Sequence, residues 1–236
     1  MNKDLYISQN AEQEYAKKNK IDLRRLSNGV TLVGTNRFVE DRAEAGIHFS
    51  FPRGSYFDPQ GKKGIHHLLE HLSAYTPLKI AQKNHTYFNA TTSSRELRII
   101  LEGTANPAVK DYGIWEVLPS IFQHILPPFA FFTSLPKILD KEKDVVFNEI
   151  NEDKANHGAY VRKAVDEALF DQINPLRTNT LGTKEDLQTI TREDIEKLTA
   201  NVFIPNDLVI DVLSEGSSQV HTVILDQIEK IVSGMQ

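Results

Sequence analysis

The pattern of apolar and polar positions predicts a chain in which strands and helices are interspersed. Short apolar or alternating runs predict strands, whereas apolar residues that recur every three or four positions predict helices. The turn signal Ser27–Asn28–Gly29 separates two of the short runs and predicts a hairpin. The predicted strands cover 23–26, 30–33, 45–51, 87–92, 97–101 and 208–213, and the predicted helices cover 65–75, 111–125, 135–156, 160–169 and 220–232.

This order of elements favours an α+β fold with a mainly antiparallel sheet and helices packed on it. Two Ser/Thr-x-x-Asp patterns, which begin at Thr183 and Thr191, predict the starts of two further helices. Residues 1–20 are predicted to form a helical or frayed leader, and 21–236 a single domain. The chain contains no internal repeat and no Ser/Gly-rich linker that would divide it.

Composition narrows the classes of function. The 236 residues carry a formal net charge of −5, which argues against a nucleic-acid partner. The absence of Cys excludes disulfides and thiolate metal sites, so any metal must be held by His, Asp or Glu. The first twenty residues are polar, and the most apolar stretch, 119–136, is interrupted by Pro127–Pro128. We therefore expect no membrane association and a cytoplasmic location.

The segment Gly64–Leu72 carries the most informative pattern. On a helix, His67, Glu70 and His71 fall on one side, with the two histidines one turn apart. This is a His-x-x-Glu-His motif, the reverse of the commoner zinc-protease order. Four apolar residues fall on the opposite stripe, which we expect to face the core: Ile65, Leu68, Leu69 and Leu72.

These residue types suit a hydrolytic metal site. Two neutral imidazoles and one carboxylate can hold Zn²⁺ and leave a position for water, whose pKa the metal lowers to about 7. A nearby carboxylate that is not a ligand, as Glu70 could be, can then act as general base. A solvated polar helix face would give the same pattern, and a metal site needs a third ligand from elsewhere in the chain.

The chain resembles the M16 metallopeptidases, the family of pitrilysin, insulin-degrading enzyme and mitochondrial processing peptidase. The similarity is to a single N-terminal-type half domain and extends over most of the chain. It rests on Leu23–Val33, Gly54–Ser55, Gly64–His71, Asn89–Thr92, Val145–Ile150, Leu181–Asp186 and Pro205–Val209. The inverted His-x-x-Glu-His motif combined with Val-Val-x-x-Glu-Ile at this separation is its most specific part.

The resemblance implies roles for five residues. His67, His71 and Glu149 would bind one Zn²⁺ per chain, and Glu70 would be the general base. Glu142 would support catalysis or ligand orientation from the same helix face as Glu149, two turns earlier. Taken by its position alone, Glu149 could equally be a surface acid, because its helix is rich in acidic residues.

The resemblance also implies how a substrate binds. Asn89, Ala90 and Thr91 would lie on an edge strand to which a peptide or unfolded polypeptide adds as a further strand. A plain edge strand blunted by polar residues is the alternative. His66 points about 100° away from His67 and is assigned no ligand role; contact with substrate at the rim is its next possibility. The remaining five histidines are expected to be surface or packing residues.

The sequence departs from the family in two respects. Thr86-Tyr87-Phe88 stands where many relatives have a glycine pair. There is also no second copy of the domain and no partner-type Arg/Tyr segment, so the chain resembles half of a chamber. The expected partner is a second half domain, in a homodimer or a heterodimer.

The function predicted from these features is a zinc-dependent endopeptidase. Its site residues would be His67, Glu70, His71, Glu142 and Glu149. The alternative is a non-catalytic M16-like assembly or substrate-binding subunit, although such subunits tend to have lost part of the motif. A metal carrier or sensor would explain the ligands but not the Asn89 strand.

Overall fold

The structure, a computed structural model, describes residues 9–106, 108–109, 112–125, 129–171, 174 and 179–234. Its strands are β1 (Asp22–Arg25), β2 (Thr31–Arg37), β3 (Ala43–Phe51), β4 (Tyr87–Thr92), β5 (Leu97–Thr104) and β6 (Val209–Gly216). Its α-helices are α1 (Gln9–Lys18), α2 (Ile65–Lys83), α3 (Ile114–Ile125), α4 (Phe129–Ala155), α5 (His157–Leu169), α6 (Lys184–Thr189), α7 (Arg192–Val202) and α8 (Ser218–Ser233). Short 3₁₀ turns, η2 (Ser55–Phe57) and η4 (Pro205–Asp207), complete the described elements. The fold is α+β, as predicted.

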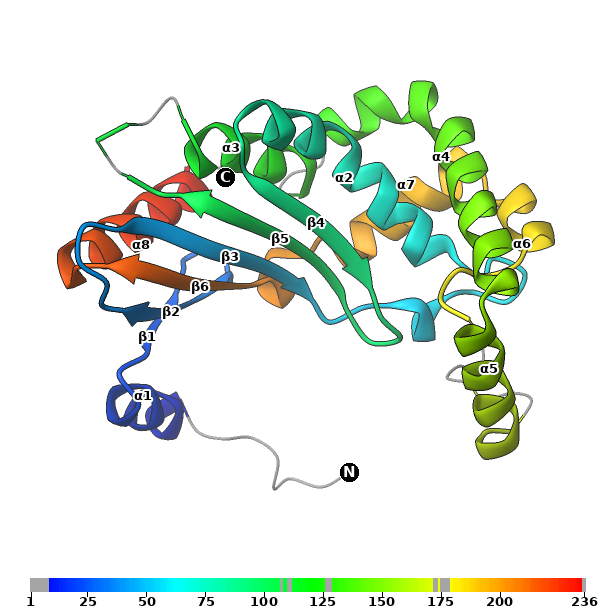
Figure 1. Cartoon of the computed structure of the whole chain (residues 1–236), viewed down its shortest axis with the longest axis horizontal. Coiled ribbons are helices and arrows are strands. Elements are labelled where there is room, and N and C mark those ends of the chain that lie inside the picture. The colour runs from blue at the N-terminus through cyan, green and yellow to red at the C-terminus, as the bar shows by residue number, and fades with distance from the viewer. Residues whose placement is uncertain are drawn as a thin grey trace.

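The strands form one six-stranded sheet in the order β1-β2-β6-β3-β5-β4 (Figure 1). Four of the five pairings between the described strands are antiparallel, and the pairing of β2 with β6 is parallel. The predicted hairpin is present as β1 and β2, with Asp22 opposite Gly34. β4 pairs only with β5, so it forms one edge of the sheet.

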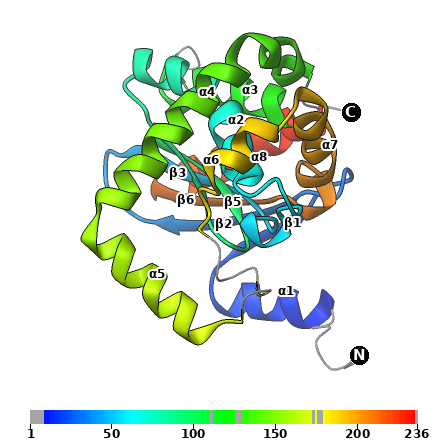
Figure 2. The same cartoon turned by 90° about the vertical axis from the view of Figure 1, so that its right-hand side faces the viewer.

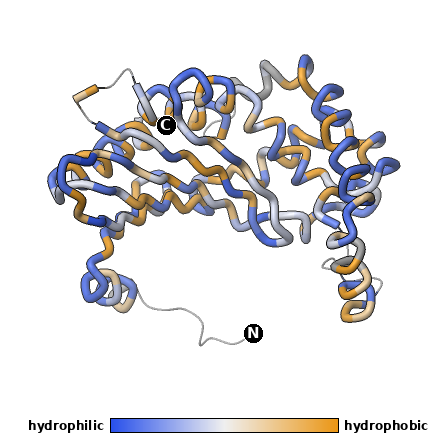
Figure 3. Tube along the Cα trace, in the orientation of Figure 1, coloured by the Kyte–Doolittle hydropathy of each residue, from blue (hydrophilic) through white to orange (hydrophobic). Residues whose placement is uncertain are grey.

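One face of the sheet carries most of the helices (Figure 2). Along β3 every second side chain is buried, which places Ile47, Phe49 and Phe51 under the helical layer. Apolar positions recur along the central strands with polar positions between them (Figure 3). The ring of Phe49 meets the edge of Phe122 from α3 at a centroid distance of 5.4 Å, which joins sheet and helices in one core.

The start of α2 is fixed by close backbone contacts. Gly64, the residue before the helix, has φ +87°, and a Cβ there would lie 2.3 Å from the carbonyl oxygen of Leu181. Gly182 is equally restricted, because its Cβ would lie 2.1 Å from the carbonyl oxygen of Lys63. The two glycines let the 181–182 segment cross the N-terminus of α2, and this crossing holds the helix that carries the His-x-x-Glu-His motif.

The helix boundaries differ from the predictions in ways that local chemistry explains. α4 begins at Phe129 rather than 135 and continues through Pro136. Asn156, predicted as the last residue of that helix, instead caps α5, and its Oδ1 accepts a hydrogen bond of 2.8 Å from the Gly158 amide. Both predicted Thr caps are present, and Thr191 forms a full capping box with Asp194. The predicted break at Pro127–Pro128 lies outside the described residues.

Residues 9–18 form a helix, as the prediction of a helical leader allows. Ala16 of α1 is buried, and Glu12 forms an ion pair of 2.9 Å with Arg25 on β1. No helix in the described part of the chain has the combination of length and apolar character that crossing a bilayer requires.

Candidate metal centre

The predicted amphipathic character of α2 is confirmed. The apolar stripe is buried in the core, with Ile65 2% exposed and Leu68, Leu69 and Leu72 fully buried. On the other side, the half-buried rings of His67 and His71 stack with a centroid distance of 4.8 Å. Because apolar packing fixes the rotation of the helix, it also fixes the direction in which both imidazoles point.

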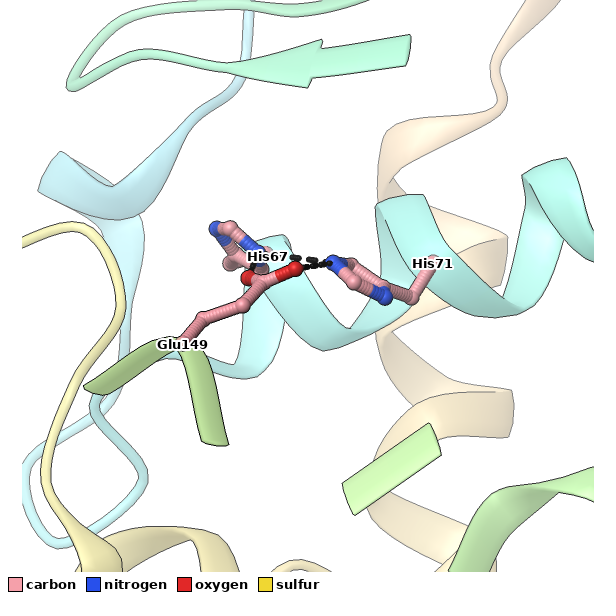
Figure 4. A group of neighbouring side chains, drawn as sticks. All are labelled: His67, His71 and Glu149. Atoms are coloured by element: carbon pink, nitrogen blue, oxygen red, sulfur yellow. Dashed lines mark hydrogen bonds and ion pairs between the residues drawn. The ribbon is translucent and has the colours of Figure 1, made fainter. Parts of the chain in front are cut away.

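Three donor groups converge in front of this face (Figure 4). The Nε2 atom of His67 lies 2.9 Å from Nε2 of His71 and 3.1 Å from Oε2 of Glu149. Nε2 of His71 lies 3.5 Å from Oε1 of Glu149. Ligands bound tetrahedrally at 2.0–2.1 Å are separated from one another by about 3.3 Å. The donor set therefore has the composition and the spacing of a zinc site, and the residues fit that metal.

Electrostatics at the centre favour positive charge. Hydrogen bonds from His67 and His71 lower the pKa of Glu149 to about 2, although partial burial opposes this shift. Burial disfavours a charge on His71, but its hydrogen bond to Glu149 and the charges of Glu149 and Glu70 outweigh burial and raise its pKa. The centre thus stabilises a proton or another cation between its imidazoles and carboxylates.

Glu142 contacts His71 at Nδ1, the ring nitrogen that does not face the other donors. Its Oε2 lies 3.3 Å from Nδ1 of His71, and the side chain is buried between α2 and α4. A carboxylate in this position fixes the tautomer in which Nδ1 carries the proton and Nε2 presents its lone pair. The prediction that Glu142 and Glu149 face the same side of one helix is correct.

Glu70 lies beside the donors without joining them. Its side chain is 8% exposed, and its Oε2 accepts a hydrogen bond of 2.9 Å from Oγ1 of Thr92. Thr92 is the last residue of β4, so this bond ties the edge strand to the middle of the motif. Thr92 belongs to the Asn89–Thr92 segment on which the resemblance rests, but its contact with Glu70 was not predicted, because that contact depends on how β4 packs against α2.

Asn89, Ala90 and Thr91 lie on β4, as predicted, and their strand packs along α2. The side chains of Asn89 and Thr91 are exposed, whereas Ala90 is half-buried. The outer hydrogen-bonding side of β4 has no partner strand within the described sheet. Among the described contacts, Thr92 rather than these three residues reaches the motif.

His66 is enclosed in the protein, so the predicted alternative of substrate contact at the rim is wrong. Its Nδ1 lies 2.6 Å from Oδ1 of Asp58, and both side chains are 1% exposed. Asp58 also accepts a hydrogen bond of 2.6 Å from the backbone amide of Gly64. The pair therefore caps the start of α2 from inside the protein. Asp58 was missed because its partners lie six and eight residues further on, too far for a capping pattern.

Two other histidines are buried packing residues, in agreement with the prediction. Nδ1 of His124 lies 2.7 Å from the carbonyl oxygen of Ser120, and burial lowers its pKa. His221 links Oγ of Ser214 at 2.7 Å with Oδ2 of Asp22 at 3.0 Å. This Ser-His-Asp chain is structural, because Ser214 is fully buried and donates to Asn36.

Sequence comparison finds relatives but no matching protein-family model. The chain is similar to the mitochondrial-processing peptidase subunit beta of Blastocladiella emersonii, with 25% identity over 206 residues. The similar region covers 81% of this chain and 40% of the relative. The subunit beta of Dictyostelium discoideum is 24% identical over 225 residues, 87% of this chain and 42% of the relative.

The fold is found in solved peptidase structures. A protease from Helicobacter pylori matches 92% of this chain and 50% of its own, with TM-score 0.71 and 20% identity. A peptidase M16 inactive domain from Pseudomonas fluorescens matches 91% of this chain and 50% of its own, with TM-score 0.71 and 12% identity. The chain spans half or less of the length of these proteins. It thus has the fold of an M16 peptidase-like half domain and sequence similarity to mitochondrial-processing peptidase subunits.

Proposed function

We propose that this chain is a half domain of an M16-type zinc endopeptidase, which hydrolyses peptides or unfolded segments of polypeptides. The observation that carries the proposal is the convergence of His67, His71 and Glu149 beside a fourth, separately held carboxylate, Glu70. The sequence similarity to subunits named as processing peptidases supports the same class of reaction.

His67, His71 and Glu149 would hold one Zn²⁺ through two nitrogens and one carboxylate. When bound, zinc supplies Lewis acidity that polarises the scissile carbonyl and makes water more acidic. Glu142 would hold His71 in the tautomer that metal binding requires, because its carboxylate accepts a hydrogen bond from Nδ1 and leaves the lone pair of Nε2 for the metal.

Glu70 is suited to move the proton. Its Oε2 is held by the hydroxyl of Thr92, while Oε1 has no hydrogen bond to the described residues. Oε1 can accept a proton from the attacking water and then donate it to the leaving amine. Thr92 serves as a positioning residue, because its hydrogen bond restricts the rotation of the carboxylate.

The edge strand β4 gives the substrate a place beside these groups. A peptide that pairs with Asn89, Ala90 and Thr91 through its main chain would be extended, and Thr92 would bring that strand to Glu70. Main-chain pairing selects extended conformation more than sequence, which suits unfolded polypeptides.

The second half of the chamber would come from another M16-like half domain. The two solved chains described above are about twice as long, since the matching region covers 50% of each. A homodimer or a heterodimer would supply the missing half. A cytoplasmic location stays a prediction, since the similar sequences are named as mitochondrial.

The decisive experiment compares wild type with Glu70→Gln. We expect both proteins to bind one zinc ion per chain, measured by elemental analysis, because Glu70 is not among the converging donors. Hydrolysis of a quenched extended peptide should fall by roughly 100-fold or more in the variant, as expected when a general base is lost. Glu152→Gln, an exposed change on α4, is the matched control and should retain activity.

The mass in solution of the same samples tests the partner. Activity from a dimer, lost with a chelator and restored by zinc, would indicate that the chain completes its own chamber. Equal activity of wild type and Glu70→Gln would contradict the role of Glu70.

A non-catalytic subunit is the second candidate, and the fold match to an inactive M16 domain favours it. Such a subunit has no need of stoichiometric zinc. Failure of the wild-type chain to bind zinc would support this candidate over the peptidase, since a scaffold can pair with a catalytic half without a metal.

A further inference from the structure

Three side chains lie just beyond the metal centre and take no part in it: Tyr75, Lys79 and Lys141, here called the Tyr75 cluster. The Nζ atom of Lys79 lies 3.7 Å from the centroid of the Tyr75 ring, and Nζ of Lys141 lies 5.1 Å from the same point. Both ammonium groups are within the range of a cation–π contact. One aromatic ring therefore gathers two positive charges from two helices.

The Tyr75 cluster is built on the same two helices as the centre. Tyr75 follows His71 by four residues on α2, and so lies one turn further along nearly the same face. Lys141 immediately precedes Glu142, whose carboxylate contacts His71. Four residues of helix rise by about 6 Å, which an extended peptide spans in about two residues.

The charge of the cluster is not neutralised. Within the described part of the chain, neither Lys79 nor Lys141 forms an ion pair with a carboxylate, and both side chains are exposed. The nearby acids of α4, Asp140 and Asp144, line a separate groove with residues of α6. Each ammonium group has three N–H donors, so a contact with the ring leaves donors for a ligand.

The surroundings of the Tyr75 hydroxyl agree with a positive local potential. Hydrogen bonding to Lys79, then to Lys141, together with their charges, lowers the pKa of this phenol. An environment that favours a phenolate over a phenol also favours other anions of similar size. The carboxylate of a peptide is the anion that a peptide substrate can bring.

We propose that the Tyr75 cluster is a carboxylate-binding subsite, which selects peptides with a carboxylate about two residues from the bond that is cut. This inference rests on the proposed peptidase function and adds a substrate class to it. The carboxylate can come from an Asp or Glu side chain or from the C-terminus of the peptide, since the chemistry recognised is the same.

The test measures binding to zinc-loaded Glu70→Gln, which does not consume the peptide. Fluorescent peptides of one length carry Glu or Gln two residues from the central bond, on either side, with an amidated C-terminus. A further pair ends two residues beyond that bond as the free acid or the amide. Fluorescence anisotropy gives each dissociation constant at low and at moderate salt.

We expect a roughly three- to tenfold preference for a carboxylate peptide over its neutral match, as two exposed charge contacts would give. The preference should shrink with salt and disappear when Lys79→Gln and Lys141→Gln are added. Lys17→Gln with Lys230→Gln is the matched control, because it changes the net charge equally on distant helices. A preference for internal Glu identifies the side chain as the source, and a preference for the free acid identifies the C-terminus.

Three outcomes would count against this inference, and they differ in what they imply for the proposed function. Equal binding of acidic and neutral peptides, with hydrolysis of the neutral peptide by wild type, would overturn the subsite and leave the peptidase intact. Absence of binding to every peptide, together with no hydrolysis of any of them by wild type, would overturn both. A preference that survives in the Lys79/Lys141 variant would place the selectivity elsewhere and overturn the assignment to this cluster.

Discussion

His66 and His67 are neighbours in the chain, yet they take part in two different kinds of histidine–carboxylate site. His66 is enclosed with Asp58, and both side chains are 1% exposed. His67 faces a different side of α2, where it is half-buried, and its Nε2 points at two further donors, from His71 and Glu149. The rotation of one residue along α2, about 100°, separates them.

The difference shows what distinguishes a structural pair from a centre that can bind a ligand. At Asp58 the carboxylate is already occupied by His66 Nδ1 and by the backbone amides of Gly64 and His66. At the centre, two imidazole nitrogens and a carboxylate converge at separations of 2.9–3.5 Å, and electron pairs face electron pairs unless protons intervene. A carboxylate whose hydrogen bonds are satisfied stabilises the fold. Nitrogen and oxygen atoms whose lone pairs converge on one point favour the binding of a cation.

The largest expected effect is on zinc binding at the centre formed by His67, His71 and Glu149. Glu149→Gln should weaken zinc binding by more than about 100-fold, since even loss of outer carboxylate partners costs about 10–100-fold. Titration calorimetry would measure it, with Glu152→Gln on the same helix as control. Affinity within threefold of wild type would remove Glu149 from the ligand set, and with it the difference between the two histidine–carboxylate sites.

At the enclosed pair of His66 and Asp58, we expect a substitution to change the stability of the fold rather than metal binding. Asp58→Ala leaves buried donors of Gly64 and His66 without a partner, and we expect a loss of about 3 kcal/mol in the free energy of unfolding. Urea unfolding of the zinc-free protein would measure it. Asp226→Ala, which removes an exposed partner of Arg24, is the control and should cost under about 1 kcal/mol. An Asp58→Ala protein of unchanged stability would show that the pair is not structural.

The smallest effect concerns pH in the zinc-free protein. The raised pKa of His71 stabilises the fold fully below its ordinary value of 6.5, and this contribution is lost as pH rises through the folded pKa. The lowered pKa of Glu149 stabilises above 4.5, and this contribution is lost as pH falls towards about 2. The centre should therefore contribute most between about pH 4.5 and 6.5.

The stability difference between wild type and His71→Gln, measured by urea unfolding from pH 4 to 8, isolates that contribution. It should be greatest near pH 5.5 and decrease on the alkaline side. A difference that grew from pH 6 to pH 8 would mean that burial, not the carboxylates, controls the charge of His71.

Local patterns predicted much of the fold because the relevant interactions are close in sequence. The strand at 87–92 has the predicted bounds, and the Thr191 cap forms as expected, since backbone alternation and capping act over a few residues. The start of α4 lies six residues before the predicted position 135, and the helix continues through Pro136, although proline usually stands in the first turn of a helix. Parallel pairing of β2 with β6 left no local signal.

At the candidate site, too, local patterns predicted some features, and contacts between distant segments were not predicted. Helical spacing placed His67, Glu70 and His71 together, and family resemblance supplied Glu142 and Glu149, which lie more than seventy residues away. Neither source gave the bond from Thr92 to Glu70 or the enclosure of His66 by Asp58. Both depend on how α2 packs against distant segments, and no spacing rule encodes that packing.

The place of β6 in the sheet has a consequence for synthesis. Residues 209–216 are the last strand to leave the ribosome among the described strands, yet they lie between β2 and β3 at the centre of the sheet. Until they emerge, two strands completed more than 150 residues earlier have no common neighbour to pair with. A nascent chain stalled before residue 209 would therefore present two open strand edges to chaperones and to other nascent chains.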